Sequence, residues 1–298
     1  MTLSPSKEKT SLLHRYLLAS VAPRPIALAS TVDKDGNPNL SPFSFFNAFS
    51  AKPPILVFSP ARRVRDNTLK HTLENIYETR EVVINTVNYE LVHQCSLSST
   101  EYPKGINEFL KSGLTQIPSL EVKPPRVKES PVQFECKVNQ VIELGKEGGA
   151  GNLVICEILL MHISDHILDE KGNIDTHKID LVSRMGYDLY CRASGTAVFE
   201  VPKPLTTLGI GIDQLPLAIR NSDILSGNDL GQLGNVETIP TEDEIKNFMK
   251  TSEPLKNLFQ KFSNDTVQLK KESHLLAKEL IKQGKVREAL IGLLNVLA

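Results

Sequence analysis

The sequence predicts a mainly β domain over residues 1–204, followed by a helical extension over residues 205–298. Short apolar runs at 25–32 and 53–59 are bounded by Pro and Gly, as buried strands commonly are. The segment 132–144 alternates apolar and polar side chains, which is typical of a half-buried antiparallel strand. The extension differs in character, because Gly and Asn are frequent at its start and helical patterns follow.

Composition places the chain among ordinary globular proteins. It has 298 residues, of which 40% are hydrophobic and 23% charged, and its formal net charge is −1 at pH 7. A charge this close to zero gives no reason to expect nucleic acid or an anionic membrane as a partner. The sequence shows no signal peptide and no apolar run near the ~20 residues of a membrane span. We therefore expect a cytoplasmic protein.

A cationic loop joins the strand at 53–59 to a helix that we expect to end near Thr79. The helix start offers free N–H groups and the positive end of the helix dipole, and Thr68 or Thr72 can cap it. Basic side chains beside such a start favour a phosphate, whereas the alternative is a solvated charged loop. The basic residues of this loop are Arg62, Arg63, Arg65 and Lys70.

The Gly-rich segment 145–151 is interpreted as a hairpin loop, because no Lys-Ser/Thr pair or helical pattern follows it to make a phosphate loop. The other elements follow from local patterns and stop signals. In chain order we expect a strand or helical turn at 11–20, a turn at 33–39, a strand at 81–87, helices near 91–99 and from Asn107 to Gly113, and strands at 132–144, 152–163 and 182–200.

Neither the histidines nor the cysteines form a metal-binding pattern, so we expect no metal. His162 and His166 are four residues apart in a strand-and-loop context and need not share a face, and His177 lies further on. The cysteines have no zinc or redox spacing, and buried reduced thiols are the default in such a chain. They are Cys95, which has polar neighbours, Cys136, Cys156 and Cys191.

The extension is expected to begin with ordered irregular chain over 206–240 that wraps the β domain. A capping box at Thr241–Glu244 then opens a helix through Lys250. Two further helices, at 265–283 and 285–297, are separated by Gly284 and predict an antiparallel helical hairpin. This hairpin resembles one tetratricopeptide unit, and a single unit cannot form a solenoid. Docking on the β domain or on a partner subunit is therefore expected instead.

Four sequence blocks resemble the flavin reductase-like, FMN-binding split-barrel family over roughly residues 15–204, in order and in spacing. The resemblance implies a Greek-key split β-barrel with peripheral helices, which forms a homodimer with FMN at the subunit interface. One departure is that the family usually has Lys-Asp-Thr where this chain has Lys70-His71-Thr72. The blocks are Pro23-Arg24-Pro25-Ile26-Ala27-Leu28, Ser41-Pro42-Phe43-Ser44-Phe45-Phe46-Asn47, Lys70-His71-Thr72-Leu73-Glu74-Asn75-Ile76 and Lys123-Pro124-Pro125-Arg126-Val127-Lys128-Glu129-Ser130-Pro131-Val132.

The resemblance also implies which residues bind the cofactor. FMN would carry the hydride chemistry, so no catalytic side chain is assigned. Phosphate contacts would come from Arg62, Arg63, Lys70 and Thr72, with His71 at the point of departure. Contacts to the ribityl chain and ring edge would come from Phe43, Ser44, Phe45, Asn47 and Ser59.

Two functional classes remain open at the level of sequence, and a third, weaker interpretation is that the C-terminal hairpin binds a partner while the β domain is structural. The first is an NAD(P)H-dependent flavin reductase or FMN-dependent oxidoreductase, acting on a flavin or another small molecule and supplying reduced flavin to a flavin-using partner enzyme. The second is a flavoredoxin-like electron carrier or flavin-binding module without substrate turnover of its own. The segment 183–190 resembles the family's arginine–glycine–tyrosine segment near the active-site mouth, although an ordinary Gly-interrupted strand would look the same.

Overall fold

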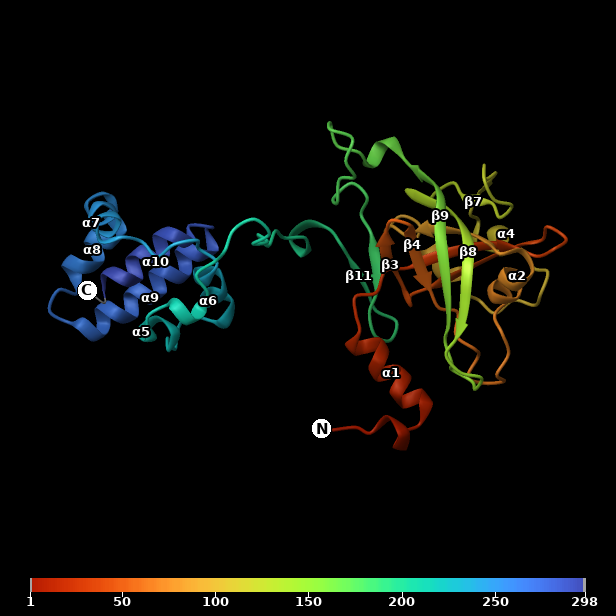
Figure 1. Ribbon diagram of the computed structural model, residues 1–298, viewed down its shortest axis with the longest axis horizontal. Coiled ribbons are helices and arrows are strands. Elements are labelled where there is room, and N and C mark those ends of the chain that lie inside the picture. Colours follow the sequence, from red (N-terminus) through yellow and green to blue (C-terminus); the bar gives the residue numbers. More distant parts are fainter. Residues whose placement is uncertain (1, 297–298) are drawn as a thin grey trace. The chain divides into compact units, whose positions relative to one another are not determined.

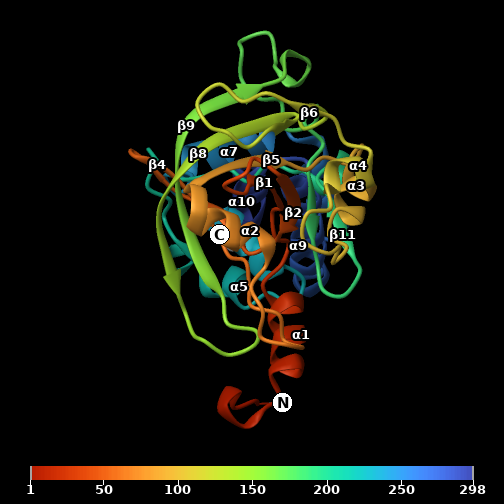
Figure 2. The same ribbon diagram turned by 90° about the vertical axis from the view of Figure 1, so that its right-hand side faces the viewer.

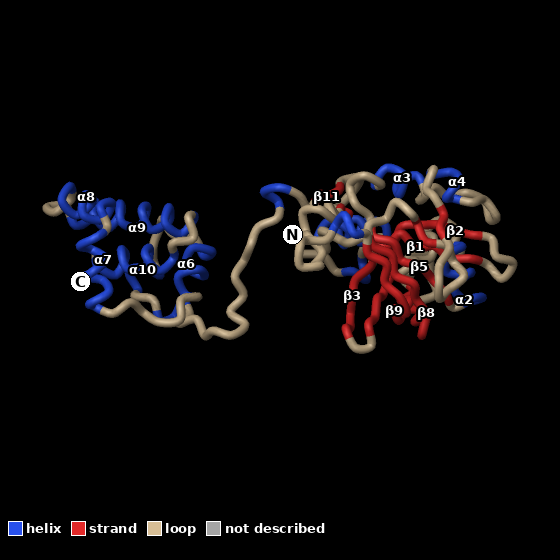
Figure 3. Tube along the Cα trace, turned by 90° about the horizontal axis from the view of Figure 1, so that it is seen from above, coloured by secondary structure: helices blue, strands red, loops and turns tan. Residues whose placement is uncertain are grey.

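The computed structural model describes residues 2–296 and divides into two compact units, Met1–Phe199 and Glu200–Ala298 (Figure 1). Strands belong to the first unit, and the second is built from helices and loops (Figure 3). Among the described residues, no helix has the length and apolar character needed to cross a membrane.

The first unit is built on a seven-stranded antiparallel sheet with the strand order β2-β1-β5-β8-β9-β4-β3. Its longest strands, β8 and β9, form the predicted hairpin around the Gly-rich loop 145–151. The strand bounds are β1 Ala27–Val32, β2 Pro38–Phe43, β3 Phe46–Ala51, β4 Pro54–Phe58, β5 Glu81–Thr86, β8 Val132–Glu143 and β9 Asn152–Ile163. Short pairs are formed by β6 Gln116–Ile117 with β7 Arg126–Val127 and by β10 Val182–Arg184 with β11 Tyr190–Arg192.

The two edge strands of this sheet, β2 and β3, are consecutive in the chain. Only Ser44 and Phe45 separate them, and three residue steps span at most about 11 Å. The sheet must therefore curl until its edges approach each other at Ser44–Phe45. No pairing joins β2 to β3 within residues 2–296, so the curled sheet is not a closed barrel.

Two hydrophobic clusters cover the two faces of the sheet, because successive residues of a strand point to opposite sides. On one face, Ala27 and Ala29 of β1 pack with Leu73 and Ile76 of helix α2 (His71–Thr79). On the other face, Ile26 and Leu28 pack with residues of α3 (Val92–Leu97) and α4 (Glu108–Ser112). Helices α3 and α4 lie beside each other near β2 (Figure 2).

Several expected helices are confirmed, with one correction at α2. The segment 11–20 is helical, as α1 (Thr10–Ser20), and α4 has the expected Asn107 cap and Gly113 stop. The expectation that Thr68 or Thr72 caps α2 is wrong, because Lys70 occupies the cap position and no side chain caps this helix. Thr72 is instead buried, and its hydroxyl accepts a hydrogen bond of 2.9 Å from the Asn39 amide.

The strand expected over 182–200, with breaks at Gly186 and Gly195, is confirmed only as two short strands, β10 and β11. The chain turns back between β10 and β11, with Tyr187 at a positive φ of 56°. Gly186 lies at this turn, where an added Cβ would approach the Cβ of Ala19 in α1 to 2.9 Å. The close passage of α1 thus favours a glycine at this turn, because any side chain there would meet Ala19.

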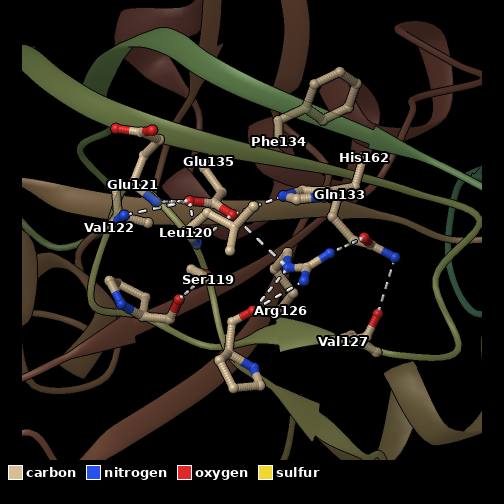
Figure 4. Close-up of polar contacts among 12 residues, drawn as sticks. Ser119, Leu120, Glu121, Val122, Arg126, Val127, Gln133, Phe134, Glu135 and His162 are labelled. Atoms are coloured by element: carbon tan, nitrogen blue, oxygen red, sulfur yellow. Dashed lines mark hydrogen bonds and ion pairs between the residues drawn. The ribbon is translucent and has the colours of Figure 1, made fainter.

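A buried carboxylate fastens the loop between β6 and β7 to the sheet (Figure 4). The side chain of Glu135 in β8 is 0% exposed and accepts main-chain hydrogen bonds from Leu120, Glu121 and Val122 at 2.6–3.3 Å. His162 of β9 lies 2.7 Å from the same carboxylate. His162 is thus a hydrogen-bond partner of the buried Glu135 carboxylate. Within the described residues, no three His, Cys, Asp or Glu side chains group as metal ligands would.

The second unit differs from the irregular wrap expected over 206–240. Two short helices, α5 (Leu217–Arg220) and α6 (Gly227–Gly234), lie in this segment, and their apolar residues share a core with α9 and α10. Ser226 and Asp229 form a capping box that starts α6 despite its glycines. The predicted helices are α7 (Glu242–Thr251), α9 (Thr266–Lys282) and α10 (Val286–Asn295), and α8 (Glu253–Lys261) is additional.

Candidate functional site

The cationic loop between β4 and α2 lines a cavity of about 420 Å³ at the surface of the first unit. A second, smaller hollow adjoins it and shares Arg63, Lys70 and Glu101 with it. The larger cavity is lined mainly by Leu13, His14, Leu17, Phe45, Arg62, Arg63, Val64, Arg65, Lys70 and Glu101. The smaller hollow is lined by Asn39, Ser41, Arg63, Lys70, His71, Thr72, Ser98, Ser99, Thr100, Glu101, Tyr102 and Glu108.

The carboxylate of Glu101 lies at the junction of the two hollows and holds three basic side chains. Its Oε1 accepts hydrogen bonds from Arg63 Nε at 3.0 Å and from Lys70 Nζ at 2.9 Å. Its Oε2 lies 3.4 Å from Arg65 Nη2. The contacts with Lys70 and Arg63 hold the pKa of Glu101 below its usual range, so the group is an anion at neutral pH. We define Arg63, Arg65 and Lys70 as the cation cluster.

Arg62 was predicted to act with Arg63, but its guanidinium is engaged elsewhere. Its Nε donates to the Asn67 side-chain oxygen at 2.6 Å, and its Nη2 donates to the Asn67 main-chain oxygen at 2.7 Å. Arg62 therefore closes the loop 62–67, in which Asn67 has a positive φ of 58°. Arg63 also donates through Nη1 to the Thr68 hydroxyl and to the Leu69 main-chain oxygen, but its Nε donates to Glu101.

The smaller hollow has polar walls at the start of α2. Asn39 donates a hydrogen bond to Thr72 in this wall. The segment Ser98–Thr100, which follows α3, also lines the hollow. Burial lowers the pKa of His71. The charge of Glu74 opposes this shift, whereas those of Arg63, Lys104 and Lys70 add to it. His71 is therefore neutral at pH 7, and the permanent positive charge of the site belongs to the cation cluster.

The larger cavity has an apolar wall made by α1. Leu13 and Leu17 line it, and the ring of His14 meets the exposed ring of Phe45 edge-on at 6.3 Å. Phe45 lies at the Ser44–Phe45 corner, where the edges of the sheet approach each other. The lining of the cavity thus combines an apolar wall with the cation cluster.

Four of the predicted cofactor residues have side chains directed elsewhere. Phe43 packs in the core against Phe58, with ring centroids 5.4 Å apart. Ser44 accepts a hydrogen bond from Arg24, and Asn47 is exposed on β3. Ser59 is buried, where its hydroxyl accepts from the Asn152 main chain. The structure therefore gathers only part of the predicted set around the two hollows, namely Phe45, Arg62, Arg63, Lys70, His71 and Thr72.

Sequence reasoning missed Glu101, His14 and the Ser98–Thr100 segment. Glu101 lies 31 positions beyond Lys70 in the chain, and it reaches the cation cluster because α3 and α4 fold back beside β2. No local pattern marks it, since an isolated glutamate in a polar loop is ordinary. Cys95 of α3, which has polar neighbours in sequence, is buried, and burial raises the pKa of its thiol to about 12.

The segment 183–190 lines a separate hollow of about 480 Å³. Arg184 stacks over the ring of Tyr190, and Arg192 over that of Tyr89, at 4.6 and 3.8 Å. Arg192 also makes a two-point ion pair with Asp180. This hollow does not share lining residues with the two hollows of the cation cluster.

The family model of the flavin reductase like domain matches residues 19–179, which lie within the first unit. The chain belongs to the flavin reductase-like family. An uncharacterized protein of Aquifex aeolicus is 39% identical over 189 residues, covering 63% of this chain and 94% of the relative. Membership indicates a flavin-related oxidoreductase and a flavin cofactor.

Two solved structures are similar to this flavin reductase-like chain. Nitrilotriacetate monooxygenase component B from Bacillus cereus has a TM-score of 0.63 at 27% identity, and covers 67% of this chain and 98% of its own. A proposed flavin reductase with a split barrel domain from Shewanella frigidimarina has a TM-score of 0.57 at 28% identity, with 68% and 99% covered. The similarity thus extends over nearly the whole length of both neighbours.

Proposed function

We propose that this protein is an FMN-dependent oxidoreductase that uses NAD(P)H as electron donor. One observation carries the proposal: the cation cluster already holds a carboxylate, and it does so beside a cavity with an apolar wall. The carboxylate of Glu101 occupies a position suited to another oxyanion, such as a phosphate. The flavin reductase-like family supplies the reason to identify that phosphate with the end of a flavin nucleotide.

The proposed contacts follow from which donors the site can present. Arg63 and Lys70 would bind the phosphate by charge-assisted hydrogen bonds. The first residues of α2 line the same hollow, and the N–H groups of a helix start would add to these donors. Thr72 and His71 complete its polar wall. A single cluster suits one terminal phosphate, and the sequence lacks the Gly-rich fingerprint of pyrophosphate binding, which favours FMN over FAD.

At the apolar wall of the cavity, the chain would position the ring system and exclude water. Bound FMN would supply the hydride-transfer chemistry itself. Leu13, Leu17 and Phe45 offer apolar contact for the rings. Main-chain N–H groups at the Ser44–Phe45 corner are the candidates to donate to the ring edge, where donors stabilise added negative charge.

We also propose a split β-barrel and a homodimer for this unit. The curled sheet, with its edges brought together at Ser44–Phe45, supports the barrel, as does the Shewanella frigidimarina neighbour. Alternate residues on one face of β9, Leu159, Met161 and Ile163, are exposed, and Phe49 of β3 is 68% exposed. Exposed apolar surface of this kind is typical of an interface, and a second copy of the chain would cover it.

Light scattering tests the homodimer, and a chain ending at residue 204 tests where its interface lies. We expect a dimer in both cases, because the exposed apolar strands belong to the first unit. A full-length monomer that binds FMN would contradict the proposal. A dimer that is lost on truncation would instead assign the interface to the second unit.

An absorbance spectrum and a turnover assay test the function. We expect flavin bands in the protein reconstituted with FMN, and NAD(P)H oxidation with free FMN as acceptor. The Bacillus cereus neighbour is a monooxygenase component, which supports delivery of reduced flavin to a flavin-using partner enzyme. Flavin bands without NAD(P)H oxidation would indicate an electron carrier, and failure to bind FMN would refute the proposal.

A further inference from the structure

The smaller hollow, and the Arg63 and Lys70 donors that Glu101 already holds, cannot accept a phosphate while Glu101 stays in place. Arg63 Nε and Lys70 Nζ both donate to Glu101 Oε1, at 3.0 and 2.9 Å. The smaller hollow has about 20 Å³ of free space, which is room for roughly one water molecule. A phosphate group is several times larger, so its entry requires that the carboxylate leave.

The side chain of Glu101 can move away from the cation cluster. Its side chain is 43% exposed, and its partners at the cluster are side chains rather than main-chain groups. The residue lies in the loop between α3 and α4, which is tied to α2 further along by an ion pair of 3.1 Å between Lys104 and Glu74. A rotation of the Glu101 side chain into water would therefore free the cluster without breaking the fold around it.

We propose that Glu101 is a built-in competitor that occupies the cation cluster when no phosphate is bound, and that it keeps FMN exchangeable. This inference rests on the proposed function. A phosphate dianion must displace the carboxylate to bind. The free energy of the Glu101 contacts is therefore lost from the free energy of phosphate binding, and the affinity for the phosphate is lower. When the flavin departs, Glu101 returns to the cluster and replaces the lost anion.

The same contacts would also be made if Glu101 had a supporting role, but removing it would then have the opposite effect on phosphate affinity. If the carboxylate only holds Arg63 and Lys70 in position, its removal would loosen the cluster and weaken phosphate binding. If it competes, its removal would strengthen phosphate binding. The sign of the change in affinity therefore separates competition from support.

The experiment compares FMN with riboflavin, which has the same ring system but no phosphate. Flavin fluorescence quenching at low salt gives the Kd of each ligand for the flavin-free full chain, and stopped flow gives the FMN dissociation rate. The variant is Glu101→Gln, with Glu101→Ala as a second variant. The control is Glu74→Gln, which removes a nearby carboxylate that pairs with Lys104 and does not contact the cation cluster.

We expect Glu101→Gln to lower the Kd of FMN about threefold to tenfold, in the range of one partly exposed ion-pair network, and to slow FMN dissociation. Riboflavin affinity should stay within about twofold, as should FMN affinity in the control. The gain should shrink at high salt, which screens exposed charges. An unchanged or weaker FMN affinity, or an equal gain for riboflavin, would overturn the inference while leaving FMN binding intact. Wild-type protein that binds no FMN would refute the proposed function, and the inference with it.

Discussion

Two glutamates of the first unit receive several hydrogen-bond donors each, yet their surroundings differ in the respect that matters for ligand binding. Glu135 is 0% exposed, and its partners include the main-chain N–H groups of Leu120, Glu121 and Val122. Glu101 is 43% exposed, and its ion-pair partners are the side chains of the cation cluster. One carboxylate is enclosed by the fold, and the other covers a surface cavity.

The comparison indicates which anion sites a ligand can enter. Main-chain donors are fixed by the fold, so displacing Glu135 would leave buried N–H groups without acceptors, at a cost of about 1–3 kcal/mol each. Side-chain donors at the surface keep water or another anion as alternative partners, and exposed ion pairs contribute only about 0–1 kcal/mol. Glu135 is therefore a structural group, whereas Glu101 occupies a site that another anion can take.

The largest expected effect is on stability, from removal of the enclosed carboxylate. Glu135→Ala should destabilise the first unit by about 3 kcal/mol, because it leaves the loop before β7 without its anchor and buried donors without an acceptor. Hydrogen exchange of peptides from β8 and β9 measures this for the first unit alone. The exposed turn residue Glu170 provides the control, as Glu170→Ala should change exchange little. Equal exchange in both variants would contradict the structural role of Glu135.

The next largest effect is expected on FMN binding, from loss of a member of the cation cluster. Arg63→Ala should weaken FMN binding about tenfold to hundredfold, since a charge-assisted hydrogen bond contributes about 1.5–3 kcal/mol. Riboflavin binding should change little, because it has no phosphate for Arg63 to hold. Fluorescence titration of both flavins makes the measurement. Equal losses for the two flavins would indicate that Arg63 acts on the loop and not on the phosphate.

Acid should reduce the stabilisation that Glu135 provides to the first unit. Burial by itself raises the pKa of Glu135, but hydrogen bonds from the Glu121 and Leu120 main chain and from His162 outweigh it, so the folded pKa lies below the ordinary 4.5. The stabilisation is then complete above the unfolded pKa and is lost as pH falls through the folded pKa. The stability gap between wild type and Glu135→Ala should narrow between pH 6 and pH 3, as followed by hydrogen exchange corrected for pH. A constant gap would show that ionisation of Glu135 contributes nothing.

Local rules in the sequence predicted much of this molecule. Alternation gave the β8–β9 hairpin, Asn107 and Gly113 gave the ends of α4, and charge density gave the loop that lines the cavity. Contacts between residues far apart in the sequence could not be predicted. Phe43 and Ser59 are buried and do not line the cavity, because Phe43 packs on Phe58 and Ser59 bonds to the Asn152 main chain. The fold-back of α3 and α4 brings Glu101 to the cavity.

Some local signals were present but were outweighed by composition. Ser226 and Asp229 form a capping box, yet the surrounding glycines and asparagines favoured an irregular chain, and α6 was missed. At Thr72 the opposite happened. A plausible helix cap was available in the sequence, but burial against Asn39 used its hydroxyl for a tertiary hydrogen bond. Tertiary packing decides between such competing local options.

The smallest expected effect concerns Arg62, which is not part of the cation cluster because Asn67 engages its guanidinium. Its guanidinium donates to the side-chain and main-chain oxygens of Asn67, at 2.6 and 2.7 Å. Arg63 also donates to a main-chain oxygen, that of Leu69, but its Nε is held by Glu101, which can move aside. Arg62 therefore has fewer donors to offer a phosphate. Arg62→Ala should therefore change the Kd of FMN by no more than about threefold, against tenfold or more for Arg63→Ala. Parallel titrations of the two variants test this, and an equal loss from both would mean that Arg62 releases Asn67 to bind the phosphate.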